Sequence, residues 1–395
     1  MKCISGHKNF RAFCLVVLML GVMLSACGVE GVQPTKTAPI SDMVVGTSSD
    51  SSTVERSGDD QDSETTQPTT AIGPTPDPCS YVLSEPGPYN VGKLTLEFED
   101  PSREGRPVGI RVWYPMDTSR EPDFSGAPYP LIISSAKVGN ELALYLVKHG
   151  FVWAGVTRID SYLHMNLEMI DQPLDILFAL EQMASNPPVE LEGLIDTEHV
   201  GAIGYSFDGY NALALGGARI DPDHYLSQCP DPDAITQASL EGYSAFSCGP
   251  AGEWEVFTAH VSDAITSSQD GLWQPITDPR IRAVIPMAAE GWWLFGEQGL
   301  AAVDRPILMI VGADDGLYTE NVAIFEHLVT PDKVLLSFVD QDHMMIYKGY
   351  IKERMAHFAA AFFGVHLQGR DELGDFLSKA LIDQCVDIAW GVYNK

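Results

Sequence analysis

Three residues in the second half of the chain have the types and the order of a nucleophile, an acid and a base. Asp315 follows the apolar run Ile307–Val311, His343 follows the run Val334–Val339, and Ser206 precedes both. A serine hydroxyl is a weak nucleophile, so it needs a base that takes its proton and an acid that orients this base. The order Ser, Asp, His therefore predicts covalent chemistry at a carbonyl carbon.

The sequence around Ser206 predicts the sharp turn that such a nucleophile needs. An apolar strand is expected over Val200–Tyr205, and a helix over Phe207–Leu215. A serine between a buried strand and a helix exposes its hydroxyl beside the positive end of the helix dipole. The alternative is a serine that only caps the helix.

The assignment of base and acid rests on position in the chain. Among ten histidines, His343 is the one that directly follows a buried strand late in the sequence. Two aspartates, Asp314 and Asp315, follow the strand before it. We prefer Asp315 as the acid that orients His343, and Asp314 is the alternative.

Neighbouring strand ends supply candidates for the rest of a catalytic cleft. An oxyanion hole needs two backbone N–H donors, which we expect from Phe207 and from Lys137 or Val138. The aromatic residues Trp292 and Trp293 follow another strand and are candidates for a wall of the substrate pocket. The alternative for these two residues is packing beneath a neighbouring segment.

The apolar pattern from residue 79 onward predicts an α/β fold. Two runs with a period of two indicate antiparallel strands, and the later runs are apolar throughout, as in parallel strands covered by helices. The expected strands are Leu94–Phe98, Val108–Trp113, Leu131–Ile133, Phe151–Val156, Val200–Tyr205, Ile281–Met287, Ile307–Val311 and Val334–Val339. The expected helices are Glu141–Lys148, Leu174–Ala184, Phe207–Leu215, Glu320–Leu328 and Ile351–Phe363. We therefore expect a doubly wound, mostly parallel sheet with leading antiparallel strands.

Residues 219–279 interrupt this pattern. They lack strand periodicity and contain several acids, which predicts an insertion, or lid, over the carboxyl edge of the sheet. Calcium binding is an alternative role for the acids, but the spacing of an EF-hand is missing. We therefore expect no metal.

Several motifs resemble one family. The chain is similar to the branch of the α/β-hydrolases that contains platelet-activating-factor acetylhydrolases and predicted dienelactone hydrolases, close to bacterial polyester hydrolases. The similar segments are Gly87–Gly92, Arg106–Pro107, Val112–Pro115, Gln172–Ile176, Asp278–Val284, Gly299–Val303 and Pro306–Leu308. The resemblance covers most of the range from Gly87 to Phe363. It implies an α/β-hydrolase fold and a serine esterase with Ser206, Asp315 and His343 as its triad. It also implies short-acyl or oxidised-lipid esters as substrates and no cofactor.

Two departures from the family pattern concern the site itself. Asp208 stands where the family usually has glycine, two positions after the serine, and Ala136-Lys137 replaces the usual His-Gly after the third strand. They raise an alternative, in which a catalytically degenerate hydrolase fold acts as a ligand-binding protein. A lipoprotein receptor for solutes is a weaker alternative, because it does not explain the serine turn.

The first 26 residues have the pattern of a secretory signal peptide. Three basic residues precede the apolar run Ala12–Leu24, which ends in the lipobox-like Leu24–Cys27. Residues 1–26 are therefore expected to be a lipoprotein signal peptide, with Cys27 as the acylated residue. The expected location is extracytoplasmic, anchored by lipid to a bacterial membrane at the cell surface or periplasmic face. A plain cleaved signal and an uncleaved anchor are the alternatives.

Residues 27–78 have the composition of a disordered tether. Between residues 28 and 78 there is no aromatic residue, 22 positions are Ser, Thr or Pro, and nine acids stand against two bases. Such a segment buries too little apolar surface to offset its conformational entropy. Residues 79–395 then form the hydrolase domain.

The charge and the cysteines restrict partners and location further. A formal net charge of −30 argues against a nucleic-acid partner, and a zinc finger is excluded because no Cys-x-x-Cys pair occurs. In an oxidising location, the four cysteines that remain beyond the acylated Cys27 allow three pairings. We expect Cys229–Cys248 to close one loop and Cys79–Cys385 to tie the two ends of the domain together. The oligomeric state is left open.

Overall fold

The computed structural model describes Cys79 and residues 81–135, 139–158, 165–229, 247–266 and 268–394. Asp77–Lys395 forms one compact unit. The expected signal peptide 1–26, the lipidation site Cys27, the tether 27–78 and the oxyanion candidates Lys137 and Val138 lie outside the described residues.

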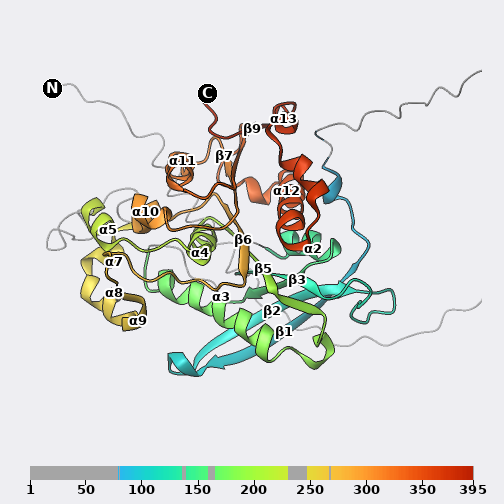
Figure 1. Ribbon diagram of the computed structural model, residues 1–395, viewed down its shortest axis with the longest axis horizontal. Helices are drawn as coiled ribbons and strands as arrows, with labels where there is room; N and C mark the ends of the chain where they lie inside the picture. Colours follow the sequence, from blue (N-terminus) through green and yellow to red (C-terminus); the bar gives the residue numbers. More distant parts are fainter. Residues whose placement is uncertain are drawn as a thin grey trace, which may run out of the picture. The chain divides into compact units, whose positions relative to one another are not determined.

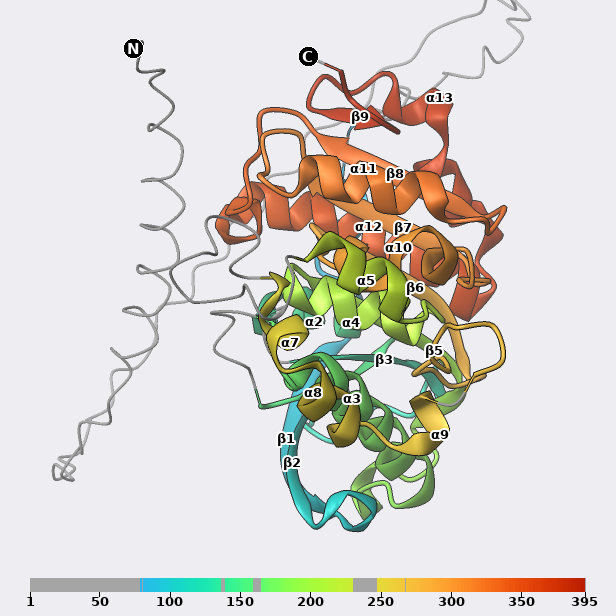
Figure 2. The same cartoon turned by 90° about the vertical axis from the view of Figure 1, so that its left-hand side faces the viewer.

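A mostly parallel sheet runs through the unit (Figures 1 and 2). In the described part of the chain it has nine strands in the order β1-β2-β4-β3-β5-β6-β7-β8-β9. The strands are β1 (Asn90–Asp100), β2 (Arg106–Met116), β3 (Tyr129–Ser135), β4 (Val152–Val156), β5 (Ile195–Tyr205), β6 (Ile281–Met287), β7 (Ile307–Gly312), β8 (Lys333–Phe338) and β9 (Ile388–Trp390). The prediction of an α/β fold with leading antiparallel strands is confirmed.

Burial along the strands explains their sequence patterns. Strand β1 alternates exposed and partly buried residues and pairs with β2 in an antiparallel hairpin. Strands β3, β4 and β7 are buried along their whole length. Strands β3 and β7 pair in parallel with both neighbours, whereas β4 pairs in parallel with β3 and antiparallel with β2. Such strands need apolar side chains on both faces because helices cover both. The edge strand β9, which pairs antiparallel with β8, was not predicted.

Helices cover both faces of the sheet. Helices α2 (Gly139–Lys148) and α12 (Gly349–Gln368) pack against each other, whereas α3 (Glu168–Ser185) packs against α4 (Phe207–Leu215) (Figure 1). Strand β5 contacts both α4 and α12. Helix α10 (Trp292–Leu300) follows β6, α11 (Tyr318–His327) follows β7, and the short helix α13 (Lys379–Ile382) precedes β9. In the described residues, no helix is both long and apolar enough to span a membrane.

The described part of the expected insertion contains four short helices and a non-helical segment over residues 268–279. Its helices are α5 (Pro222–Gln228), α7 (Gly249–Gly252), α8 (Trp254–His260) and α9 (Asp263–Thr266). Trp254, Phe257 and Trp273 stack in its interior. Helix α5 packs against α10, which follows strand β6, and His260 of α8 contacts Asp171 near the start of α3. The insertion therefore lies against segments that follow the carboxyl ends of strands.

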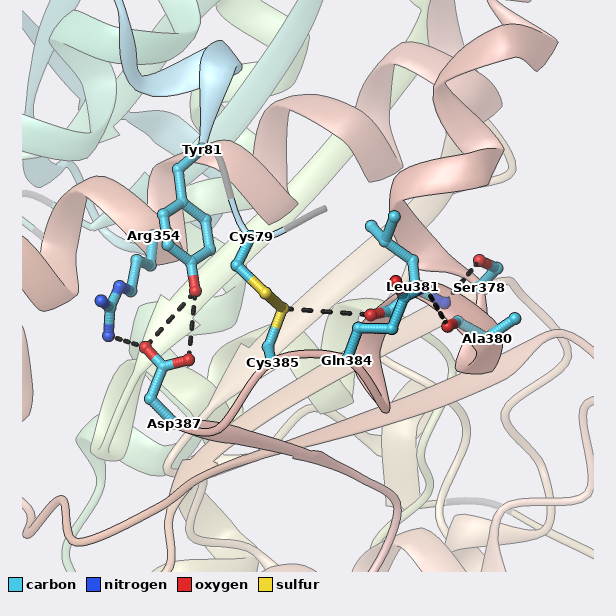
Figure 3. Close-up of a disulfide and its surroundings, with 9 residues drawn as sticks. All are labelled: Cys79, Tyr81, Arg354, Ser378, Ala380, Leu381, Gln384, Cys385 and Asp387. Atoms are coloured by element: carbon cyan, nitrogen blue, oxygen red, sulfur yellow. Dashed lines mark hydrogen bonds and ion pairs between the residues drawn. A yellow bond between two sulfur atoms is a disulfide. The ribbon is translucent and has the colours of Figure 1, made fainter. Parts of the chain in front are cut away.

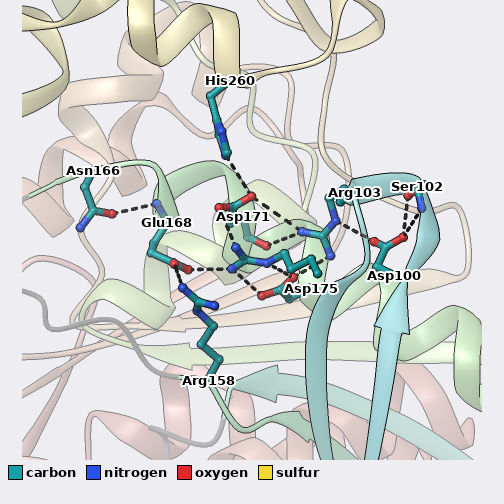
Figure 4. Close-up of polar contacts among 10 residues, drawn as sticks. Asp100, Ser102, Arg103, Arg158, Asn166, Glu168, Asp171, Asp175 and His260 are labelled. Atoms are coloured by element: carbon teal, nitrogen blue, oxygen red, sulfur yellow. Dashed lines mark hydrogen bonds and ion pairs between the residues drawn. The ribbon is translucent and has the colours of Figure 1, made fainter.

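Buried charges join the hairpin β1-β2 to α3. The Arg106 guanidinium donates to both oxygens of Asp175 at 2.9 and 3.0 Å and to Asp171 at 2.9 Å. The same cluster includes Arg103, Arg158, Glu168 and His260 (Figure 4). Asp175 is 1% exposed, so its charge depends on these arginines for compensation.

Both expected disulfides are present. Cys229 pairs with Cys248, and Cys79 pairs with Cys385 across 306 residues of sequence (Figure 3). Beside the second bridge, Asp387 accepts a hydrogen bond from Tyr81 and forms an ion pair with Arg354. The two disulfides indicate an oxidising, extracytoplasmic setting.

Candidate active site

Ser206 lies on a strained turn between β5 and α4. Its φ of 61° and ψ of −123° fall outside the regions that an L-residue usually occupies, and such strain persists only where the surroundings determine it. The Ser206 N–H donates to the carbonyl of Met287, the last residue of the neighbouring strand β6, at 2.9 Å. The turn is also tight: a Cβ on Gly204 would lie 1.8 Å from the carbonyl oxygen of Asp208.

The structure brings Ser206, His343 and Asp315 together. His343 Nε2 lies 3.0 Å from Ser206 Oγ, and His343 Nδ1 lies 2.9 Å from Asp315 Oδ2. Ser206 is 8% exposed, the Asp315 side chain is fully buried and the His343 side chain is one-third exposed. A proton can pass from the hydroxyl to the imidazole, while the carboxylate orients the ring and stabilises its charged form.

Asp315, rather than its neighbour Asp314, supplies the carboxylate at this contact. It follows β7, and its second oxygen accepts a hydrogen bond from the N–H of Leu317 at 2.8 Å. The N–H of Asp314 instead donates to the carbonyl of Gln341, two residues before His343. The two loops that carry acid and base are thus joined by their backbones as well.

Two residues that contact this group were not predicted to do so. The hydroxyl of Tyr205 donates to the backbone carbonyl of His343 at 2.7 Å. Burial and the nearby charge of Asp315 hold the pKa of Tyr205 well above its usual value, so the hydroxyl keeps its proton. The second residue is Glu290, whose Oε1 lies 3.3 Å from Ser206 Oγ. One feature of the sequence could have pointed to Glu290: it follows β6, the strand next to the one that carries Ser206.

The loop that carries Glu290 is held from α11. Asn321 donates to the carbonyl of Ala289 and accepts from its N–H, both at 2.9 Å. Glu320 accepts from the N–H groups of Gly291 and Trp292 at 3.0 and 3.1 Å. Ala288, with φ of 43°, adopts a backbone conformation that is unusual for a residue with a side chain. These contacts hold the backbone on both sides of Glu290.

Asp208 lies beneath the turn. It is 1% exposed, and its carboxylate accepts hydrogen bonds from the hydroxyl of Ser135 at 2.5 Å and from the amide of Asn211 at 3.3 Å. Asn211 in turn donates to Gln172 of α3 at 2.9 Å. The Asp208 carboxylate therefore ties the first turn of α4 to the end of β3.

The remaining predicted residues differ in where they lie. Phe207 is the first residue of α4 and is fully buried, and its N–H as an oxyanion donor stays a prediction. The ring of Trp292 packs against His224 of α5 and His327 of α11, with centroids 5.2 and 4.8 Å away. This favours packing beneath the insertion for Trp292. Trp293 is partly buried against the core, in the helix α10 that was not predicted.

No protein-family model matches the chain, and no curated protein matches it.

Proposed function

We propose that this protein is a serine hydrolase of carboxylic esters with an α/β-hydrolase fold. The observation that carries the proposal is the contact of one histidine with both partners: His343 Nε2 lies 3.0 Å from Ser206 Oγ, and Nδ1 lies 2.9 Å from Asp315 Oδ2. The strained turn at Ser206 and the chain order Ser, Asp, His support the same reaction.

Each member of the group has a defined part in the proposed reaction. Ser206 Oγ attacks the ester carbonyl carbon while His343 takes the hydroxyl proton, and His343 then gives this proton to the leaving alcohol. Water, deprotonated by the same imidazole, releases the acid from the acyl-enzyme. The N–H of Phe207 and the N-terminus of α4 stabilise the tetrahedral oxyanion. We infer short-acyl lipid esters or related small esters as the substrate class.

We further propose that Cys27 carries lipid after removal of residues 1–26, and that residues 27–78 hold the enzyme away from the membrane. Mass spectrometry of the full chain made in a bacterial host tests this. Acyl chains on Cys27 are expected, and a Cys27→Ser variant should leave the membrane fraction. A membrane-bound Cys27→Ser protein would contradict the anchor.

Labelling with a fluorophosphonate tests the catalytic part of the proposal. The wild-type protein should react covalently and Ser206→Ala should not, with circular dichroism to show that both are folded. Hydrolysis of p-nitrophenyl acetate and octanoate then reports the preferred acyl length. Folded wild-type protein without Ser206-dependent labelling would reject the esterase.

That outcome would favour the second candidate, a ligand-binding protein built on a degenerate hydrolase fold. Two carboxylates near the serine that the triad does not use, Asp208 and Glu290, are the observation in its favour.

A further inference from the structure

Tyr205 joins the nucleophile to the base through a single side chain. It directly precedes Ser206, is 4% exposed, and donates from its hydroxyl to the backbone carbonyl of His343 at 2.7 Å. One group on the strand that carries the serine therefore holds the backbone of the residue that supplies the imidazole.

The position of His343 matters because, among the described residues, Ser206 has two acceptors within reach. Its hydroxyl oxygen lies 3.0 Å from His343 Nε2 and 3.3 Å from Glu290 Oε1. A hydroxyl has one proton to donate. When the Ser206 hydroxyl donates its hydrogen bond to His343, the imidazole can take the proton. When the hydroxyl donates to Glu290 instead, the imidazole has no hydrogen bond from Ser206 and cannot act as the base. A small displacement of His343 would make Glu290 the nearer acceptor.

The two acceptors are not held in the same way. The loop of Glu290 is fixed at three N–H groups and one carbonyl by α11. The His343 ring is one-third exposed, and its bond to Asp315 fixes the orientation of the imidazole rather than the backbone that carries it. The bond from Tyr205 acts on that backbone, at the carbonyl of His343 itself.

We propose that Tyr205 is a positioning residue that keeps His343, rather than Glu290, the acceptor of the Ser206 proton. The inference rests on the proposed ester hydrolysis. It adds the residue that determines which acceptor receives the Ser206 proton.

The chain offers a matched pair of variants for the test. Tyr205→Phe removes the hydroxyl and keeps the ring. Tyr210→Phe does the same at a residue that is also buried and also donates to a backbone carbonyl, that of Met169 at 2.9 Å. Tyr205→Phe should lower kcat for p-nitrophenyl acetate about tenfold with KM nearly unchanged. The two substitutions should lower Tm by similar amounts, because each removes one buried hydrogen bond. Tyr210→Phe, however, should leave kcat within about twofold of the wild-type value.

Both substitutions are then repeated in a Glu290→Ala background. Without the competing carboxylate, the loss of kcat caused by Tyr205→Phe should shrink to about twofold, because no second acceptor is left. A tenfold loss that persists in this background would overturn the inference. Equal kcat values for Tyr205→Phe and Tyr210→Phe would overturn it as well.

Failure of the proposed function gives a different result. Wild-type protein without Ser206-dependent hydrolysis would reject the esterase and this inference together. An active wild-type enzyme whose rate is the same with tyrosine or phenylalanine at position 205 would reject the inference alone.

Discussion

Asp314 and Asp315 follow the same buried strand, but they make different contacts. The side chain of Asp315 accepts a hydrogen bond from the imidazole of His343, whereas the backbone of Asp314 holds Gln341. An acid that orients a histidine acts through its charge and its geometry, and an amide in its place favours the wrong tautomer. Substitution of each aspartate in turn therefore tests which of the two orients His343.

We expect Asp315→Asn to lower kcat by about three to four orders of magnitude with a small change in KM, because the imidazole loses its orienting carboxylate. Asp314→Asn, as the control, should retain most of the activity. Steady-state kinetics on p-nitrophenyl acetate, with unfolding curves to exclude loss of structure, measure both. The reverse ranking would assign the acid to Asp314.

At the residue scale, strand ends were enough to find Ser206, Asp315 and His343. Each follows an apolar run, and parallel strands end at a common edge, so their side chains were expected to meet. Tyr205 and Glu290 were not assigned contacts with this group. Tyr205 reaches a backbone carbonyl, which leaves no pattern in the sequence, and the strained Ala288 that directs Glu290 is an ordinary alanine in the printed chain.

Among the elements, the hairpin β1-β2 is attached to α3 through the guanidinium groups of Arg103 and Arg106. Arg106 is 14% exposed at its side chain and donates to Asp171, Asp175 and Glu168. Removal of one partner from a buried ion pair leaves an uncompensated charge, which costs more than the pair itself contributes.

Arg106→Ala should therefore lower the free energy of unfolding by about 3 kcal/mol, measured in urea. Arg370→Ala is the control, because its pair with Glu372 is largely exposed and such pairs contribute about 0 to 1 kcal/mol. Similar losses for the two variants would show that the Arg106 cluster is not coupled to folding.

The attachment of the residues around Leu83 to α12 should depend on pH. His357 is 1% exposed, and its Nδ1 accepts a hydrogen bond from the N–H of Leu83 at 3.1 Å. Burial, with a smaller effect of His149, lowers the pKa of His357 to about 4. Below pH 6.5 the unfolded chain binds a proton at this residue that the folded chain cannot bind.

The stability that His357 supports is thus present above pH 6.5 and should be lost as the pH falls from 6.5 to 4. The loss is on the order of 3 kcal/mol. Urea unfolding at a series of pH values measures it. His357→Gln removes this titration and should flatten the curve over that range, whereas the same slope in both proteins would refute the assignment.

Element type was predictable wherever a long pattern existed. The buried strands β5, β6 and β7 and the helices α4 and α12 match runs of consistent periodicity. The missed elements are short or irregular: β9 has three residues, α7 and α9 have four, and α10 contains Gly296 in a non-helical conformation. Such segments take their form from tertiary packing, because a few residues define no period.

On the scale of the whole molecule, the two disulfides close loops of very different length. Cys79 and Cys385 are 306 residues apart, and Cys229 and Cys248 are 19 apart. In the chain-entropy account, a cross-link stabilises by restricting the unfolded chain, and the effect grows slowly with loop length.

Replacement of both Cys79 and Cys385 by serine should lower the unfolding free energy by about 5 to 6 kcal/mol, against about 3 kcal/mol for the Cys229 and Cys248 pair. Each variant removes both cysteines of a bridge, so neither leaves an unpaired partner. Denaturant titration under non-reducing conditions ranks the two. A larger loss for the shorter loop would mean that native contacts, rather than chain entropy, decide the effect.

The bridge between Cys79 and Cys385 also makes the polypeptide between them a covalent ring. A protease that cuts one exposed peptide bond inside this ring opens it without releasing a fragment. The two pieces remain one molecule, joined through sulfur at one end and through the packed sheet along its length. A nicked chain therefore keeps its mass on a non-reducing gel and separates into two bands only after reduction.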